Sequence, residues 1–137
     1  MTSHRSLIYR TTALVPGCPP ELVSVALDYT DAAPYEVGLT LYRDSHQTQM
    51  FMFNREFLAD GLHTEAGQGE VMVRPHNSMT SLVTIRIRPA DAYPFEIDLD
   101  RETVTDFVEM ALMLVPVGQE PLPDFDAELA ALLDGGQ

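Results

Sequence analysis

Residues 53–62, Phe-Asn-Arg-Glu-Phe-Leu-Ala-Asp-Gly-Leu, and residues 67–75, Gly-Gln-Gly-Glu-Val-Met-Val-Arg-Pro, are the most informative part of this sequence. Asn54 can cap a short helix, and Gly61 can end that helix in the left-handed conformation. The second stretch predicts a turn at Gly67 and Gly69 that leads into a short strand over 70–74. The region therefore predicts a short helix between two groups of strands, with structural roles for Asn54, Arg55, Glu56, Gly61, Gly67, Gly69 and Pro75.

The roles of Arg55 and Glu56 stay open at this point. Their opposite charges are compatible with an internal ion pair or with a contact between subunits, and a structural role is favoured.

The segments before this region read as strands. Apolar residues alternate with other residues over 7–15, 23–29 and 37–41, which is the period of half-buried strands, and turn-forming residues separate these segments. The next strand, 47–53, is apolar on both faces, so a helix, a second sheet or another subunit must cover its second face. We therefore predict an antiparallel meander whose last strand supplies the oligomer contacts Met50, Phe51 and Met52.

A hairpin follows over 83–88 and 95–99. Placing both apolar sets on one face requires Ile87 opposite Phe95 and Ile85 opposite Ile97, with Val83 opposite Leu99. This register also places Arg86 opposite Glu96, which predicts a cross-strand ion pair.

Two helices complete the predicted fold. Asp100 can cap a helix over 101–115, and a further helix is expected from Asp124 to Leu133. The 137 residues then form one domain of the α+β class, with about seven antiparallel strands in two packed sheets. Residues 1–5 and 134–137 are predicted to be flexible.

The charge of the chain restricts its partners. Twenty-one acidic residues face eight arginines, which gives a net charge of −13, and positions 91–137 hold twelve of the acidic residues with only Arg101 to oppose them. Such a field repels phosphate backbones over a screening length of about 10 Å. On the helix over 101–115 the charge follows one side, so we predict a partner-binding face formed by Glu102, Asp106, Glu109 and Met113.

The sequence offers little support for catalysis. The single cysteine, Cys18, lies in a predicted loop without a nearby base, and no Gly-x-Ser-x-Gly elbow is present. A metal set of His63, Glu65, Glu70 and His76 lacks a His-Glu-x-x-His spacing, and the glycines at 67 and 69 are followed by a strand rather than by a phosphate-binding helix. We expect no enzyme activity, no metal and no cofactor. Without a signal peptide or a long apolar segment, a cytoplasmic location is expected.

The two opening stretches resemble the signature of the SsgA-like family, which runs approximately Phe-x-Arg-Asp-Leu-Leu-x-x-Gly-Leu and then Gly-x-Gly-Asp-Val-x-Val-x-Pro. Further elements that are similar to the family lie at 27–29, 34–37, 115–120 and 125–133. The resemblance therefore covers nearly the whole chain from about Val25 onward.

This resemblance implies a Whirly-like fold, assembly as a homotrimer and a role in sporulation and septation in actinobacteria. Family members help to position and assemble the division ring of the tubulin-like GTPase FtsZ at septa, directly or through other division proteins, and have no known catalysis or cofactor. Whirly proteins proper bind single-stranded DNA, which is the alternative function. That alternative is disfavoured here because the net charge is −13 and tryptophan is absent.

Overall fold

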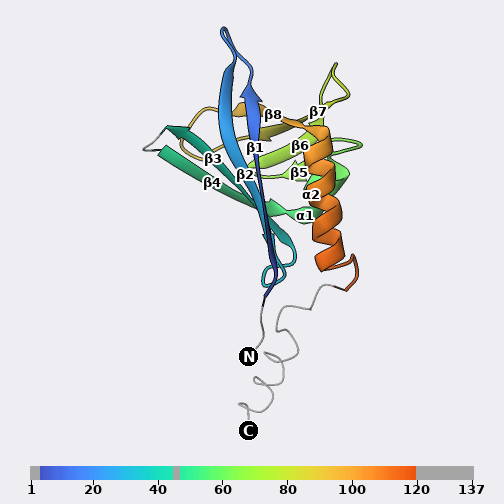
Figure 1. The fold of residues 1–137 in the computed structure, drawn as a ribbon. Coiled ribbons are helices and arrows are strands. Elements are labelled where there is room, and N and C mark those ends of the chain that lie inside the picture. The colour runs from blue at the N-terminus through green and yellow to red at the C-terminus, as the bar shows by residue number, and fades with distance from the viewer. Residues whose placement is uncertain (1–3, 45–46, 120–137) are drawn as a thin grey trace.

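The computed structural model describes residues 4–44 and 47–119, which form eight strands and two helices (Figure 1). The elements in chain order are β1 (Ser6–Val15), β2 (Glu21–Thr30), β3 (Glu36–Asp44), β4 (Gln47–Asn54), α1 (Arg55–Asp60), β5 (Ala66–Gln68), β6 (Val71–Pro75), β7 (Leu82–Ile87), β8 (Phe95–Asp100) and α2 (Arg101–Leu114).

The strands form one sheet in the order β4-β3-β2-β1-β8-β7-β6-β5, and every pair is antiparallel. The predicted division into two sheets is therefore corrected to two halves of a single sheet. The halves join where Leu14, near the end of β1, pairs with Asp98 of β8. They run in clearly different directions, so the sheet turns sharply at this junction (Figure 1).

The predicted hairpin register is confirmed, because Ile87 pairs with Phe95, Ile85 with Ile97 and Val83 with Leu99. Arg86 also lies opposite Glu96 as expected. The Glu96 carboxylate, however, accepts a hydrogen bond at 2.6 Å from Nη2 of Arg74, which lies on β6.

The strand β5 was not predicted, because Gly67 reads as a turn residue. In the structure Gly67 pairs with Met72 inside the β5–β6 hairpin, with a φ of 141°. A Cβ at this position would contact the Val71 carbonyl oxygen and the Met72 backbone, so glycine permits the close approach of the two strands. The turn itself falls at Gly69, whose φ is 80°.

The cap of α1 is confirmed, while its predicted ending is wrong. The Asn54 side chain accepts a hydrogen bond at 2.8 Å from the backbone N–H of Glu56. Gly61 is right-handed, with a φ of −65°, rather than left-handed. Glycine is needed there because a Cβ would run into the side chain of Val73 on β6.

One apolar core fills the inner side of the sheet. The helix α2 contacts strands of both halves as well as α1, and Phe107 packs edge-on against Tyr9 with ring centroids 5.4 Å apart. Val104, Phe107 and Ala111 are fully buried, as the periodicity of α2 predicts. The helix thus closes the core and turns its opposite side to solvent.

Some predictions fall outside the described residues, namely the helix from Asp124 to Leu133, the flexible tail 134–137 and the flexibility of residues 1–3. His4 and Arg5 are described: Nδ1 of the His4 ring and the backbone N–H of Arg5 contact Oδ1 of Asp31, at 3.1 Å and 3.0 Å. Neither α1 nor α2, the helices of the described ranges, has the length and apolar character that a membrane span requires.

Candidate interaction surface

The role of Arg55, which the sequence left open, follows from the contacts of its side chain. Its side chain is buried, and Nη1 donates hydrogen bonds to Oη of Tyr29 at 2.9 Å and to the carbonyl oxygens of Val115 at 2.5 Å and Ala111 at 3.4 Å. The Tyr29 hydroxyl in turn donates to the carbonyl oxygen of Pro34 at 3.0 Å. The arginine therefore ties the strand β2 to the end of α2.

The position of this contact has a simple electrostatic reason. The last carbonyl groups of a helix have no partner within the helix and carry the negative end of its dipole. Arg55 supplies a cation and hydrogen-bond donors there, and α2 has no basic residue of its own in its last turn. Glu56, the next residue, is exposed. Arg55 is thus a structural residue, and only Glu56 is available to a partner.

The predicted partner face on α2 is exposed as expected. Glu102, Asp106 and Glu109 all face solvent, and Met113 is 74% exposed. Their spacing of four, three and four residues places them along one side of the helix. At the same end of α2, Met110 is 38% exposed and Val117, just after the helix, is 67% exposed.

The three carboxylates of this face are unpaired among residues 4–44 and 47–119, because none of them forms an ion pair or side-chain hydrogen bond there. Like charges three and four residues apart destabilise a helix by about 0.2–0.5 kcal/mol per pair. Glu102, in the first turn, is favoured by the helix dipole, but Asp106 and Glu109 gain no such stabilisation, and the exposed row of carboxylates suits the recognition of a cationic partner. We call Glu102, Asp106, Glu109, Met110 and Met113 the acidic stripe.

The predicted oligomer contacts divide between two environments. Met50 is 65% and Met52 is 49% exposed on the outer side of β4, whereas Phe51 points inward and belongs to the core. The exposed Ile8 of β1 lies on the same outer side, because Ile8 pairs with Asp28, Asp28 with Gly38 and Gly38 with Met52. Phe51 can therefore support such a contact only from within the fold.

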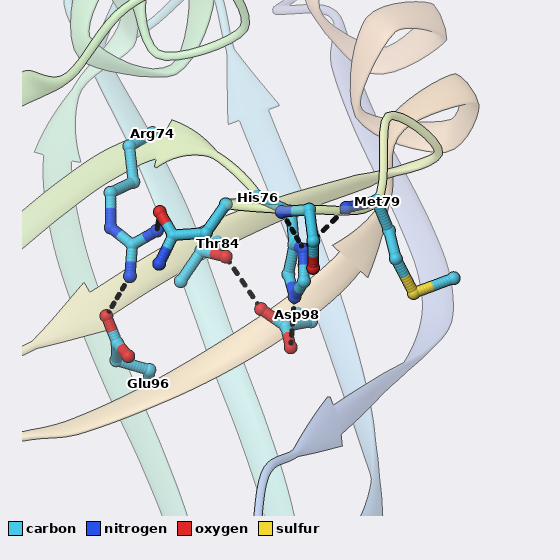
Figure 2. Close-up of polar contacts among 8 residues, drawn as sticks. Arg74, His76, Met79, Thr84, Glu96 and Asp98 are labelled. Atoms are coloured by element: carbon cyan, nitrogen blue, oxygen red, sulfur yellow. Dashed lines mark hydrogen bonds and ion pairs between the residues drawn. The ribbon is translucent and has the colours of Figure 1, made fainter.

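The structure also contains a polar cluster that the sequence did not predict (Figure 2). Thr84 donates a hydrogen bond to Oδ1 of Asp98 at 2.7 Å, and both side chains are buried on neighbouring strands. Nε2 of His76 lies 3.7 Å from Oδ2 of the same carboxylate. Beside them Arg74 binds both Glu96 and Asn77.

This histidine and aspartate have the residue types of a catalytic pair, but their geometry fits a structural role. Nδ1 of His76 accepts hydrogen bonds from the backbone N–H groups of Ser78 at 3.1 Å and Met79 at 2.9 Å. The nitrogen that would act as a base is thus occupied in shaping the loop after β6. The alternation of polar residues on β7 and β8, together with the hairpin register, is the signal that could have placed Thr84 opposite Asp98.

The candidate metal set is not assembled. In the described ranges, no three histidine, cysteine, aspartate or glutamate side chains come together in a way that could hold a metal ion. His76 instead belongs to the polar cluster with Asp98. The absence of a metal stays a prediction for the chain as a whole.

Comparison with known proteins relates this chain to one family. The model of the family described as Streptomyces sporulation and cell division protein, SsgA, matches residues 23–120. The sporulation-specific cell division protein SsgB of Frankia casuarinae is 30% identical over 125 residues, covering 90% of this chain and 87% of the relative. SsgB of Kineococcus radiotolerans is 32% identical over 132 residues, covering 93% and 76%.

A solved structure shows the same fold. The SsgA-like sporulation-specific cell division protein from Thermobifida fusca superposes with a TM-score of 0.80 at 24% sequence identity, covering 96% of this chain and 98% of that chain. The family match spans most of the present sequence, and its signature region contains the Asn54 cap, the buried Arg55 and the close contact at Gly61. The chain therefore belongs to the SsgA family of sporulation and cell division proteins.

Proposed function

We propose that this protein is a non-enzymatic adaptor in sporulation-linked cell division, which helps to localise or assemble the FtsZ division ring at septa. The relatives reported above carry the name of sporulation-specific cell division proteins, which supports a division role. The finer assignment to the division ring, directly or through other division proteins, and to a septal and cytoplasmic location is our proposal.

The observation that carries the adaptor role is the acidic stripe. An exposed row of carboxylates beside exposed methionines combines charge for orientation with apolar surface for contact. The polar cluster of the fold supports this view, because its histidine is engaged with backbone groups rather than aimed at a substrate. We therefore propose that the protein works by binding other proteins, without a cofactor.

We further propose that the adaptor acts as a homotrimer of Whirly-like arrangement. The outer side of the four-stranded half supports self-association, because Ile8, Met50 and Met52 expose apolar surface there. This surface lies on β1 and β4, so it is separate in sequence and in the fold from the acidic stripe of α2. Two different faces would allow one subunit to contact both its copies and a partner.

The test measures two quantities: the capture of FtsZ and its membrane tethers by the protein, and the mass of the assembly that the protein itself forms. The triple variant Glu102→Lys, Asp106→Lys and Glu109→Lys should lose capture of purified FtsZ and of its membrane tethers, while its mass by light scattering stays that of the wild type. The variant Met50→Glu with Met52→Glu is the matched control, because it should lower the mass of the assembly and leave the stripe intact. Unchanged capture by the triple variant would reject this face.

A further inference from the structure

A hollow lies between the two helices, next to the acidic stripe. It has a volume of about 420 Å³ and is lined by residues of α1 and of the turn after it, Ala59, Leu62 and His63, and by residues of α2, Arg101, Thr105, Val108, Glu109 and Leu112. We call it the helix groove. Its apolar lining comes from Ala59 of α1, from Leu62 of the turn after α1, and from Val108 and Leu112 of α2.

The groove is held in place by structure already described. Arg55, in the first turn of α1, is bonded to the carbonyl groups at the end of α2, while His63, after α1, reaches the first half of α2. The two helices therefore run in opposite directions, and Gly61 packs the end of α1 against β6. A groove between such fixed walls needs little rearrangement when a ligand enters.

The charges around the groove are mostly negative. Glu109 lines it, Asp106 lies one turn before Glu109 on α2, and Glu56 and Asp60 are exposed on α1. The positive exception among the lining residues is Arg101. A ligand with apolar groups and several cationic side chains therefore fits the groove better than an acidic ligand.

We propose that the helix groove binds a basic amphipathic helix of a partner protein, with aliphatic side chains on the apolar lining and arginines or lysines against Glu109, Asp106 and Glu56. Recognition of a helix in a groove uses apolar anchors one and two turns apart, and the length of α2 offers room for about three such turns. This inference deepens the proposed function and depends on it for the identity of the partner. It adds the partner's secondary structure and the sign of its charge.

The alternative occupant is the end of this chain, residues 120–137. That segment contains the apolar residues Phe125, Leu129, Leu132 and Leu133, but it also carries five acidic residues and no arginine or lysine. It would bring negative charge to a negative rim. Charge complementarity thus favours a basic partner over the chain's own terminus.

The inference can be tested with the full-length protein and four peptides of about 18 residues each, a length that allows a stable helix. One peptide has leucines at helical spacing and an arginine face, the second replaces the arginines with glutamates, and the third replaces the leucines with serines. The fourth is residues 120–137 of this chain. Binding is measured by fluorescence anisotropy, and the site is mapped by chemical shifts in NMR spectra optimised for large assemblies, because three chains of 15.2 kDa each would form the proposed trimer.

The leucine and arginine peptide should bind at least about tenfold more tightly than any of the other three in about 50 mM salt, and the difference should shrink in about 500 mM salt. The shifts should centre on Ala59, Thr105 and Leu112. Ala59→Arg and Glu109→Lys should each weaken this binding by about tenfold, because both put a cation into the site. Tyr93→Arg, between β7 and β8 and 92% exposed, should leave it unchanged.

Several results would overturn the inference. They are equal binding of the arginine and glutamate peptides, tighter binding of the peptide 120–137, shifts that map outside the groove, and no binding by any peptide. The shift map on the wild-type protein decides the matter even if Ala59→Arg fails to fold. If the groove binds the basic peptide but FtsZ and its tethers are not captured, the groove inference stands and the proposed function fails. If capture depends on the stripe but no peptide enters the groove, the proposed function stands and the groove inference fails.

Discussion

Replacement of Arg55 by alanine should destabilise the protein by about 3 kcal/mol. The variant loses two short hydrogen bonds from a buried cation, to Oη of Tyr29 at 2.9 Å and to the Val115 carbonyl oxygen at 2.5 Å, and each such bond contributes about 1.5 kcal/mol or more. It also loses the stacking of the guanidinium on Tyr29, at 5.4 Å from the ring centroid, while the burial of a charge is relieved. For a chain of this size the loss corresponds to a decrease in Tm of roughly 10 °C.

Urea unfolding followed by circular dichroism measures this change in the free energy of unfolding. Arg55→Lys should fall between the wild type and Arg55→Ala, because an ammonium group keeps a cation near these acceptors but lacks the planar guanidinium that lies over the Tyr29 ring. Glu56→Ala is the control and should stay within about 0.5 kcal/mol of the wild type, since its side chain is exposed. A value for Arg55→Ala within about 0.5 kcal/mol of the wild type would refute the view that this residue anchors α2.

Three further predictions concern the sheet and α2. Gly61→Ala should lower the free energy of unfolding by about 1–3 kcal/mol, because the new Cβ meets Val73. Gly69→Asn, in an open turn with positive φ, should change this free energy by less than about 0.5 kcal/mol. Equal losses for the two variants in a urea titration would contradict the steric explanation. Thr84→Val should lower the free energy of unfolding by about 1–3 kcal/mol because a buried Asp98 oxygen loses its hydrogen-bond donor, and Thr84→Ser should restore most of the loss. A Thr84→Val variant with the Tm of the wild type in thermal unfolding would show that this hydrogen bond is not needed. Asp106→Lys should raise the free energy of unfolding by a few tenths of a kcal/mol, because it replaces charge repulsion from Glu102 and Glu109 with attraction to them. A clear decrease in Tm would argue that the acidic stripe has a structural role.

Local signals in the sequence predicted a large part of the fold. The hairpin of β7 and β8 followed from alternation, because the observed register gives Val83, Ile85 and Ile87 each an apolar partner on the same face. The cap of α1 and the buried side of α2 are equally local features. The exposure of Glu102, Asp106, Glu109 and Met113 followed directly from the helical period.

Features that depend on distant contacts were not predictable in this way. The pairing of Leu14 with Asp98, which makes the sheet continuous, joins segments far apart in the chain and has no pattern within either strand. The handedness of Gly61 could not be read either, because the need for glycine comes from the approach of Val73 rather than from a turn. Glycine has both uses, and only the fold separates them.

The candidate site likewise combines features that the sequence predicts with features that depend on the folded structure. Periodicity identified Glu102, Asp106, Glu109 and Met113, but it could not reveal the groove beside them, whose lining comes from α1, the turn after it and α2. It also could not show that Phe51 is directed into the core while its neighbours Met50 and Met52 are exposed, since both faces of β4 are apolar. Two-sided strands need the surrounding structure before their faces can be assigned.

The most direct test of the central claim is co-sedimentation of the purified protein with polymers of FtsZ from the same organism, in the presence and absence of its membrane tethers. The wild type should sediment with the polymers or with the tethered polymers. The triple variant Glu102→Lys, Asp106→Lys and Glu109→Lys should remain in the supernatant while keeping its fold and its assembly mass. Co-sedimentation of the triple variant at the wild-type level would contradict the account, as would a wild-type protein that stays in the supernatant under both conditions.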